Sequence, residues 1–212
     1  MVYGRNIGRR TLDFGHEGIL YRNSFIMYDR DTESLWVHTT GECIKGKLKG
    51  RQLQFIPSSV TSWGAWKKSH PKSLVLEGKK ARGFMGTFSL SPERAARFGL
   101  SIGQGDDVKL YPVSELTKRR VIHDRFGKEG VVVFFDKDDL HGTAWRSGDH
   151  RFSWNGKQIV DAKGRAWDMM IGLPVGADDD SEKLDPLAAT MWLTKRWTGF
   201  YPRSTVWAPK ER

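Results

Sequence analysis

The chain of 212 residues contains one cysteine, and this scarcity excludes several kinds of protein. A single thiol cannot form an internal disulfide, and it cannot build a zinc site from several cysteines. We expect this residue, Cys43, to be a buried and unreactive thiol inside a strand. No apolar run reaches the roughly 18 to 20 residues of a transmembrane helix, so we predict no membrane span.

Sequence signatures of targeting and catalysis are also missing. The N-terminus, Met-Val-Tyr-Gly-Arg, has no signal-peptide pattern, so the chain as written is expected in the cytoplasm. The sequence has no His-Glu-x-x-His spacing and no Gly-x-Ser-x-Gly element, and its glycines do not form a P-loop. We therefore predict no metal site, and the sequence leaves any cofactor unknown.

The chain does have enough apolar residues for a packed core and an excess of positive charge. Hydrophobic residues make up 38% of it and aromatic residues 12%, which excludes a disordered chain. The formal net charge is +10 at pH 7. Such a charge suits an anionic partner, either a small ligand or nucleic acid, but a basic surface also occurs in proteins that bind neither.

Seven residues recur after a fixed step of 131 positions, which indicates one structural unit used twice. We place the first unit at residues 1–77, a connector at 78–130 and the second unit at 131–212. The four matched tryptophans are expected in the core, whereas the five unmatched ones are freer to line a groove. The matched pairs are Trp36 and Trp167, Gly41 and Gly172, Leu53 and Leu184, Trp66 and Trp197, Pro71 and Pro202, Ser73 and Ser204, and Val75 and Val206.

Strand and turn signals predict a mainly β, α+β protein of two homologous units of short antiparallel strands, related by a pseudo-twofold axis. The run at 131–135 is the most β-prone and is expected to be a central strand. Asn155-Gly156 predicts a hairpin turn. Each unit is expected to end in a short helix, a proline and a strand, with the helices at 62–68 and 191–197 and the strands at 73–76 and 204–207.

The first unit shows no counterpart of the strand at 131–135, because the chain begins shortly before Leu12. We expect an open apolar edge near Leu12–Phe14 or Phe25–Tyr28. An unpaired edge is a template for another chain, so self-association through the first unit is predicted. The gap is also expected if the chain is a fragment of a longer protein, which would then be exported.

Several stretches resemble a known family. Residues 27–36 (Met-Tyr-Asp-Arg-x-Thr-x-Ser-x-Trp), 41–44 (Gly-Glu-Cys-Ile) and 63–66 (Trp-Gly-Ala-Trp) are similar to the domain of unknown function 3179 family of bacteria and archaea. Shorter matches at 109–112 and 196–202 extend the resemblance over nearly the whole chain. The resemblance implies a prokaryotic protein but no particular activity. It also implies an upstream Cys-Pro-x-Cys element, which this sequence lacks.

The densest polar cluster is the predicted turn that precedes Trp36. Its Asp29 and Glu33 can bind a polar ligand or act as general acid or base, but Asp and Ser side chains can equally hold a tight turn. The second unit has other residue types where Asp31 and Ser34 stand, which favours a function confined to the first unit. The candidate ligand-binding residues are Tyr28, Asp29, Arg30, Thr32, Ser34, His38 and Glu42, and catalytic residues stay unassigned.

Three functions remain open. The first is a ligand-binding or scaffold protein without catalysis, favoured by the absence of any nucleophile, metal or cofactor motif. The second is a hydrolase-type enzyme, which requires His38 and Glu42 to converge with the acidic turn. The third is nucleic-acid binding through a basic surface, which added salt would weaken.

Overall fold

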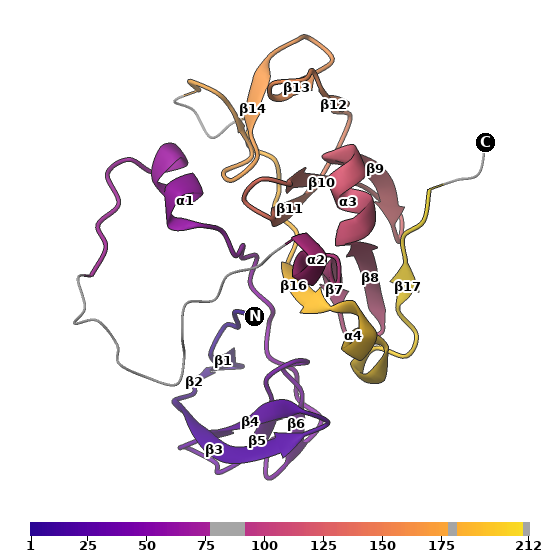
Figure 1. Cartoon of the computed structure of the whole chain (residues 1–212). Coiled ribbons are helices and arrows are strands. Elements are labelled where there is room, and N and C mark those ends of the chain that lie inside the picture. Colours follow the sequence, from indigo (N-terminus) through magenta and orange to yellow (C-terminus); the bar gives the residue numbers. More distant parts are fainter. Residues whose placement is uncertain (77–91, 178–181, 210–212) are drawn as a thin grey trace.

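The computed structural model describes residues 1–76, 92–177 and 182–209, and the first part of the predicted connector, 78–91, lies outside these residues. Short strands, nearly all antiparallel, dominate the described chain and are joined by four short helices, so the mainly β, α+β class is confirmed. Figure 1 shows a small lobe of N-terminal strands and a larger body that holds the strands from β7 onward.

The N-terminal lobe is a meander of four antiparallel strands in the order β3-β4-β5-β6. Side chains of Leu12, Trp36, Cys43 and Leu53 are fully or almost fully buried on its inner side and form its core. A short hairpin precedes the meander. The strands are β1 (Asn6–Ile7) and β2 (Arg10–Thr11) in the hairpin, then β3 (Phe14–Tyr21), β4 (Ser24–Asp29), β5 (Leu35–Val37) and β6 (Cys43–Lys45).

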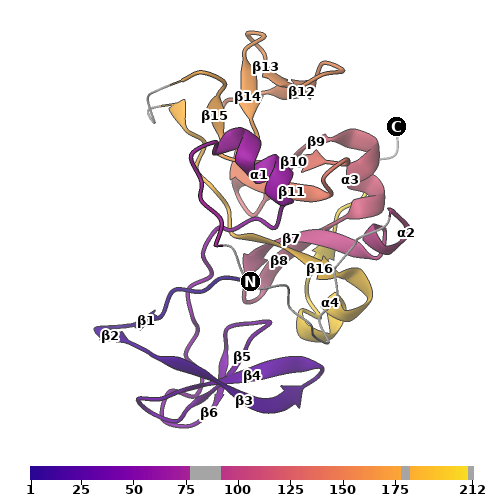
Figure 2. The same cartoon turned by 60° about the vertical axis from the view of Figure 1, so that its left-hand side comes forward.

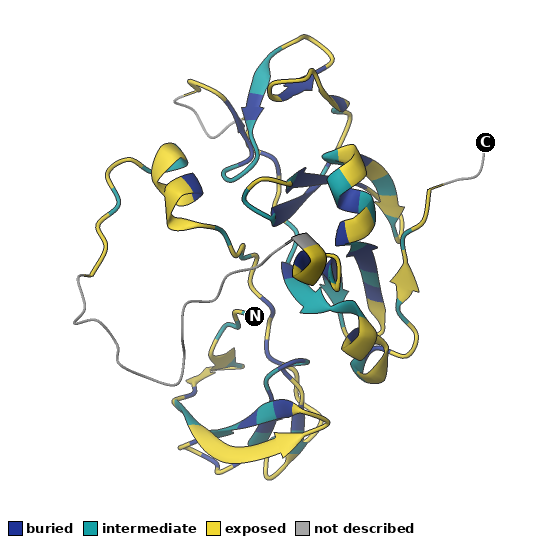
Figure 3. Cartoon of the chain, viewed as in Figure 1, coloured by how far each residue is buried: buried dark blue, intermediate teal, exposed yellow. Residues whose placement is uncertain are grey.

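The first residues of the chain pair with residues 54–56 of this lobe. Val2 and Gly4 make backbone hydrogen bonds of 2.9 Å with Ile56 and Gln54. Leu12 is fully buried. The other predicted edge lies within β4, which is flanked by β3 and β5. The prediction of an open apolar edge is therefore wrong for Leu12 and for Phe25–Tyr28, whereas β3, which begins at Phe14, is the exposed edge strand of the sheet (Figure 3).

The larger body has its main core between two sheets. One sheet has the order β16-β7-β8-β17 and the other the order β11-β10-β9, and helix α3 packs against both. β10 contains the run at 131–135, which is buried, and the strand is paired on both sides, so the predicted central strand is confirmed. The elements are α2 (Pro92–Ala95), β7 (Phe98–Gln104), β8 (Asp107–Pro112), α3 (Val113–Arg119), β9 (Val121–Phe126), β10 (Glu129–Asp136), β11 (His141–Arg146), β16 (Ala189–Leu193) and β17 (Thr205–Val206).

A third sheet, in the order β12-β13-β14-β15, projects from the body above β10 and β11 (Figure 1). The predicted hairpin at Asn155-Gly156 is present between its first two strands. The Asn155 side chain accepts hydrogen bonds from the backbone N–H groups of Lys157 and Gln158 at 3.0 and 2.9 Å. The strands are β12 (Phe152–Trp154), β13 (Ile159–Asp161), β14 (Ala166–Asp168) and β15 (Leu173–Pro174).

Two helices of seven residues, α1 (Trp63–Ser69) and α4 (Thr194–Phe200), lie 131 positions apart and end with the same backbone geometry. Their surroundings differ. Trp197 is buried with Val108 and Leu110 of β8, whereas the matching Trp66 is 37% exposed. The prediction that all four matched tryptophans lie in the core is therefore wrong at Trp66, because α1 has no such strand beneath it. The predicted strand at 73–76 is also not formed.

Candidate functional site

The polar turn between β4 and β5 is held by one buried carboxylate. Asp29 accepts hydrogen bonds from the backbone N–H and the hydroxyl of Thr32, at 2.6 and 2.9 Å, and from the indole N–H of Trp36 at 2.9 Å. Burial alone would raise the pKa of Asp29, but these hydrogen bonds outweigh it and lower the pKa. The carboxylate is therefore ionised and fully engaged within the protein.

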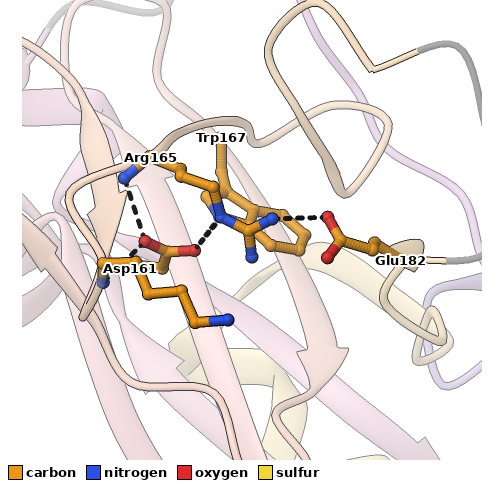
Figure 4. Close-up of polar contacts among 5 residues, drawn as sticks. Asp161, Arg165, Trp167 and Glu182 are labelled. Atoms are coloured by element: carbon orange, nitrogen blue, oxygen red, sulfur yellow. Dashed lines mark hydrogen bonds and ion pairs between the residues drawn. The ribbon is translucent and has the colours of Figure 1, made fainter.

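The C-terminal half of the chain contains the same arrangement, in which the aspartates are 132 residues apart and the tryptophans 131. Asp161 accepts hydrogen bonds from the indole N–H of Trp167 at 3.1 Å and from the backbone and guanidinium N–H groups of Arg165 at 2.9 Å (Figure 4). Burial again acts to raise the pKa of Asp161, and these hydrogen bonds lower it to about 2. Arg165 also donates to Glu182 at 2.6 Å.

An aromatic ring completes both arrangements. Phe14 packs edge-on against Trp36 with ring centres 5.8 Å apart, and Phe152 packs edge-on against Trp167 at 5.2 Å. The argument for a function confined to the first predicted unit therefore loses its support, because an aspartate is buried under a tryptophan in both halves of the chain. The shared geometry shows that the carboxylate holds a turn.

The other candidate residues around this turn divide between its inside and its surface. Thr32 and Ser34 are buried and their hydroxyl oxygens lie 2.7 Å apart. Arg30 faces solvent, where its guanidinium donates to the Tyr28 hydroxyl at 2.9 Å and pairs with the Asp13 carboxylate at 3.2 Å. Arg30 is therefore the candidate residue of this turn that is exposed to a ligand, beside the exposed Asp31 and Glu33.

His38 and Glu42 lie at the opposite end of the meander and do not converge with the turn. The N–H of His38 bonds to the carbonyl of Phe25, at the start of β4, whereas Asp29 ends that strand. Four residues of extended strand separate the two places by about 13 Å. Burial, together with the nearby N-terminal ammonium group, lowers the pKa of His38 to about 4. The convergence that a hydrolase of this type requires is therefore absent.

Cys43 is buried, as expected, and burial raises the pKa of its thiol. Within the described residues there is no group of three or more His, Cys, Asp or Glu side chains that could hold a metal ion. Nor does this part of the chain contain a helix long and apolar enough to cross a membrane.

Two cavities border α1, which follows the N-terminal lobe in the chain and lies beside β10 and β11 of the larger body (Figure 2). Ser62 caps this helix by accepting the N–H of Ala65 at 3.1 Å, and its hydroxyl donates to Asp139 at 2.7 Å. An apolar cavity of about 340 Å³ lies at this contact. Its lining includes Pro57, Ser59 and Trp66 from the first unit, and Ala144, Trp145 and Leu187 from the body.

A second, more polar cavity of about 290 Å³ touches the other side of α1. Its lining includes His141, Trp154, Lys157 and Asp168. We call the two cavities together the α1 cleft. Trp145 and Trp154 are two of the five unmatched tryptophans expected to line a groove. None of the seven candidate ligand-binding residues lies in either lining, because separate segments create the cleft and no local motif marks it.

The fold and this cleft define a mainly β, α+β protein with a small-molecule-sized cavity between its two parts. Residues 1–97 match the model of a family described as Protein of unknown function (DUF3179), so this part of the chain is similar to that family. The stretches at 109–112 and 196–202 lie outside the matched range. No curated protein and no solved structure matches the chain.

Proposed function

We propose that this protein binds a small molecule in the α1 cleft and acts as a binding protein without catalysis. One observation carries the proposal: elements far apart in the sequence enclose a cavity of about 340 Å³, lined by Trp66 and Trp145. Pockets for small ligands are commonly apolar, of about 300 to 1,000 Å³, and placed between domains or units. The two-unit organisation predicted from the sequence is part of this proposal.

Few contacts attach α1 to the larger body, so a ligand can enter the cleft beside this helix. Among the described residues, two side-chain hydrogen bonds join this region to the body, from Ser62 to Asp139 at 2.7 Å and from Ser59 to the carbonyl of Gly142 at 3.4 Å. Of the α1 residues, only Ala65 is buried. A ligand that bridges α1 and the body would therefore add contacts to a weakly attached element.

The experiment is a thermal-shift screen of a metabolite library, followed by calorimetric titration of each compound that stabilises the protein. Ser59→Trp fills the apolar cavity and is expected to weaken binding at least tenfold. Ser114→Trp, on the exposed side of α3, is the matched control and should bind normally. A ligand whose affinity is unchanged by Ser59→Trp, or a library without any ligand, would refute the proposal in favour of a scaffold.

Nucleic-acid binding is a second candidate, supported by one basic surface. A shallow hollow beside α4 is lined by Arg97, Leu193, Thr194, Lys195 and Arg196, and it has no acidic residue in its lining. The test is binding of a random duplex and a single strand at about 50 and 200 mM salt, where electrostatic binding must weaken. An affinity that salt or the double variant Lys195→Glu/Arg196→Glu leaves unchanged would exclude this function.

A further inference from the structure

The polar cavity of the α1 cleft is organised around one buried histidine. His141 begins β11 and pairs across the hairpin with Asp136, so the two side chains leave the same face of the sheet. The imidazole is only 2% exposed. Neither of its ring nitrogens has a hydrogen-bond partner among the described residues. Buried polar atoms in folded proteins are nearly always paired, so an unpaired imidazole in a cavity wall indicates a missing partner.

The charge state of His141 limits what that partner is. Burial lowers the pKa of His141, against the opposing effect of three nearby carboxylates on Asp136, Asp139 and Asp168. The ring is therefore neutral at pH 7, with one nitrogen that donates and one that accepts a hydrogen bond. A hydroxyl group satisfies either nitrogen, because it can both donate and accept.

The carboxylates around His141 offer further acceptors. One oxygen of Asp136 accepts backbone N–H groups in the hairpin, and one oxygen of Asp168 accepts the N–H of Met170 at 2.7 Å. The second oxygen of each has no hydrogen-bond partner within the described chain. These oxygens accept only from donors, so the inner end of the cavity favours a ligand with several hydroxyl groups.

Positive side chains and an aromatic ring border the same cavity. Lys68 of α1 and Lys157 of the β12–β13 turn are exposed, and neither makes an ion pair within the described residues. Arg120 is already engaged, with Asp138 at 2.9 Å and over the ring of Trp154 at 4.3 Å. Two unpaired ammonium groups suit an anionic substituent. Trp154, still 37% exposed, offers an apolar surface to a ring.

We propose that this cavity binds a monosaccharide that carries a carboxylate or phosphate group, with its hydroxyls on His141 and Asp168 and its anionic group on Lys68 and Lys157. The volume of about 290 Å³ accommodates one sugar ring. The inference rests on the proposed function and gives it a ligand class. It also assigns a role to a face of the second unit that no sequence motif indicated.

The experiment is calorimetric titration of the full chain with glucuronate, glucose 6-phosphate and glucose. We expect the two anionic sugars to bind at least tenfold more tightly than glucose. The double variant Lys68→Gln/Lys157→Gln should remove this preference, whereas Lys45→Gln/Lys47→Gln, on the N-terminal lobe, should keep it. If glucuronate alone binds, the anionic group is a carboxylate, and if glucose 6-phosphate alone binds, it is a phosphate.

His141→Phe separates a binding role from a structural one. Phenylalanine retains a buried ring and removes two unpaired nitrogens, so the melting temperature should be unchanged or higher while affinity for the anionic sugar falls at least tenfold. Unchanged affinity in this variant would overturn the proposal. If no sugar binds but another compound does, and Ser59→Trp blocks it, the sugar inference fails and the proposed function stands. If nothing binds, both fail.

Discussion

Asp29 and Asp161 illustrate how one buried carboxylate can fix a turn. Each accepts an indole N–H from the tryptophan of the following strand and N–H groups of the turn itself. A hydrogen bond to a charged group typically stabilises a protein by about 1.5 to 3 kcal/mol. Aspartate, which suggested acid–base chemistry in the sequence, therefore acts here by fixing the backbone of a turn.

The Asp161 turn makes stability depend on pH in the acid range. Its pKa is lowered from 3.8 to about 2, so its contribution is complete above about pH 4 and is lost as the pH falls through 2. The difference corresponds to about 2 kcal/mol. In urea unfolding at pH 5, 3 and 2, the wild type should lose about 2 kcal/mol more than Asp161→Asn does.

The exposed Asp149→Asn provides the control for this measurement and should follow the wild type. Parallel losses of stability in Asp161→Asn and the wild type would contradict the assignment. Asp29→Asn tests the matching turn of the first unit, where hydrogen bonds also lower the pKa, and its effect should have the same sign.

At the scale of elements, α1 and α4 show how much the recurring residues predicted. The 131-residue step separates α1 from α4 and makes β14 the counterpart of β5, but the helix predicted at 191–197 begins only at Thr194, because residues 191–193 belong to β16. It misses the equivalence of Asp29 with Asp161, because that pair is 132 positions apart. Insertions and deletions in a hairpin are invisible to a comparison without gaps, whereas the hydrogen bonds of the turn identify the pair directly.

The sequence also left the α1 cleft unpredicted, for a different physical reason. Its walls come from α1, β11 and the segments before β16, and each wall is an ordinary stretch of apolar or small residues. Only their packing creates a cavity. Tyr28 and His38 were predicted as ligand-binding residues because they lie close in sequence to other polar residues. In the structure, the Tyr28 hydroxyl accepts a hydrogen bond from Arg30, and His38 stacks on Phe25.

The two matched tryptophans of α1 and α4 should differ sharply in their effect on stability. Trp197→Ala removes a side chain that is 1% exposed and should cost about 3 to 5 kcal/mol. Trp66→Ala removes one that is 37% exposed and should cost about 1 kcal/mol. Chemical unfolding of both variants measures the difference, and equal losses would show that α1 is packed as firmly as α4.

At the scale of the whole molecule, the end of the first unit exposes an apolar segment. Leu74, Val75 and Leu76 are 96%, 62% and 95% exposed. The matching β17 pairs in parallel with β8, so the backbone of this second copy is hydrogen-bonded, although Val206 is still 49% exposed. An uncovered apolar segment of this kind favours contact with another chain.

We expect self-association to run through this segment and not through the edge strand β3. Leu74→Ser/Leu76→Ser should shift the protein toward monomer in analytical ultracentrifugation. Leu20→Ser, on β3 and 68% exposed, is the control and should leave the distribution unchanged. A monomeric wild type, or a monomer produced by the β3 variant alone, would contradict this expectation.

The pairing of β7 with β16 has a kinetic consequence. These strands join residues 98–102 with 189–193, about 90 positions apart, whereas each strand of the N-terminal meander pairs with its neighbour in the chain. Closing a long loop delays a contact, so the meander should acquire protection from hydrogen exchange before β7 and β16 do. Before β16 pairs with β7, that edge of β7 is exposed. During this interval the newly synthesised chain is most prone to pair with another protein chain.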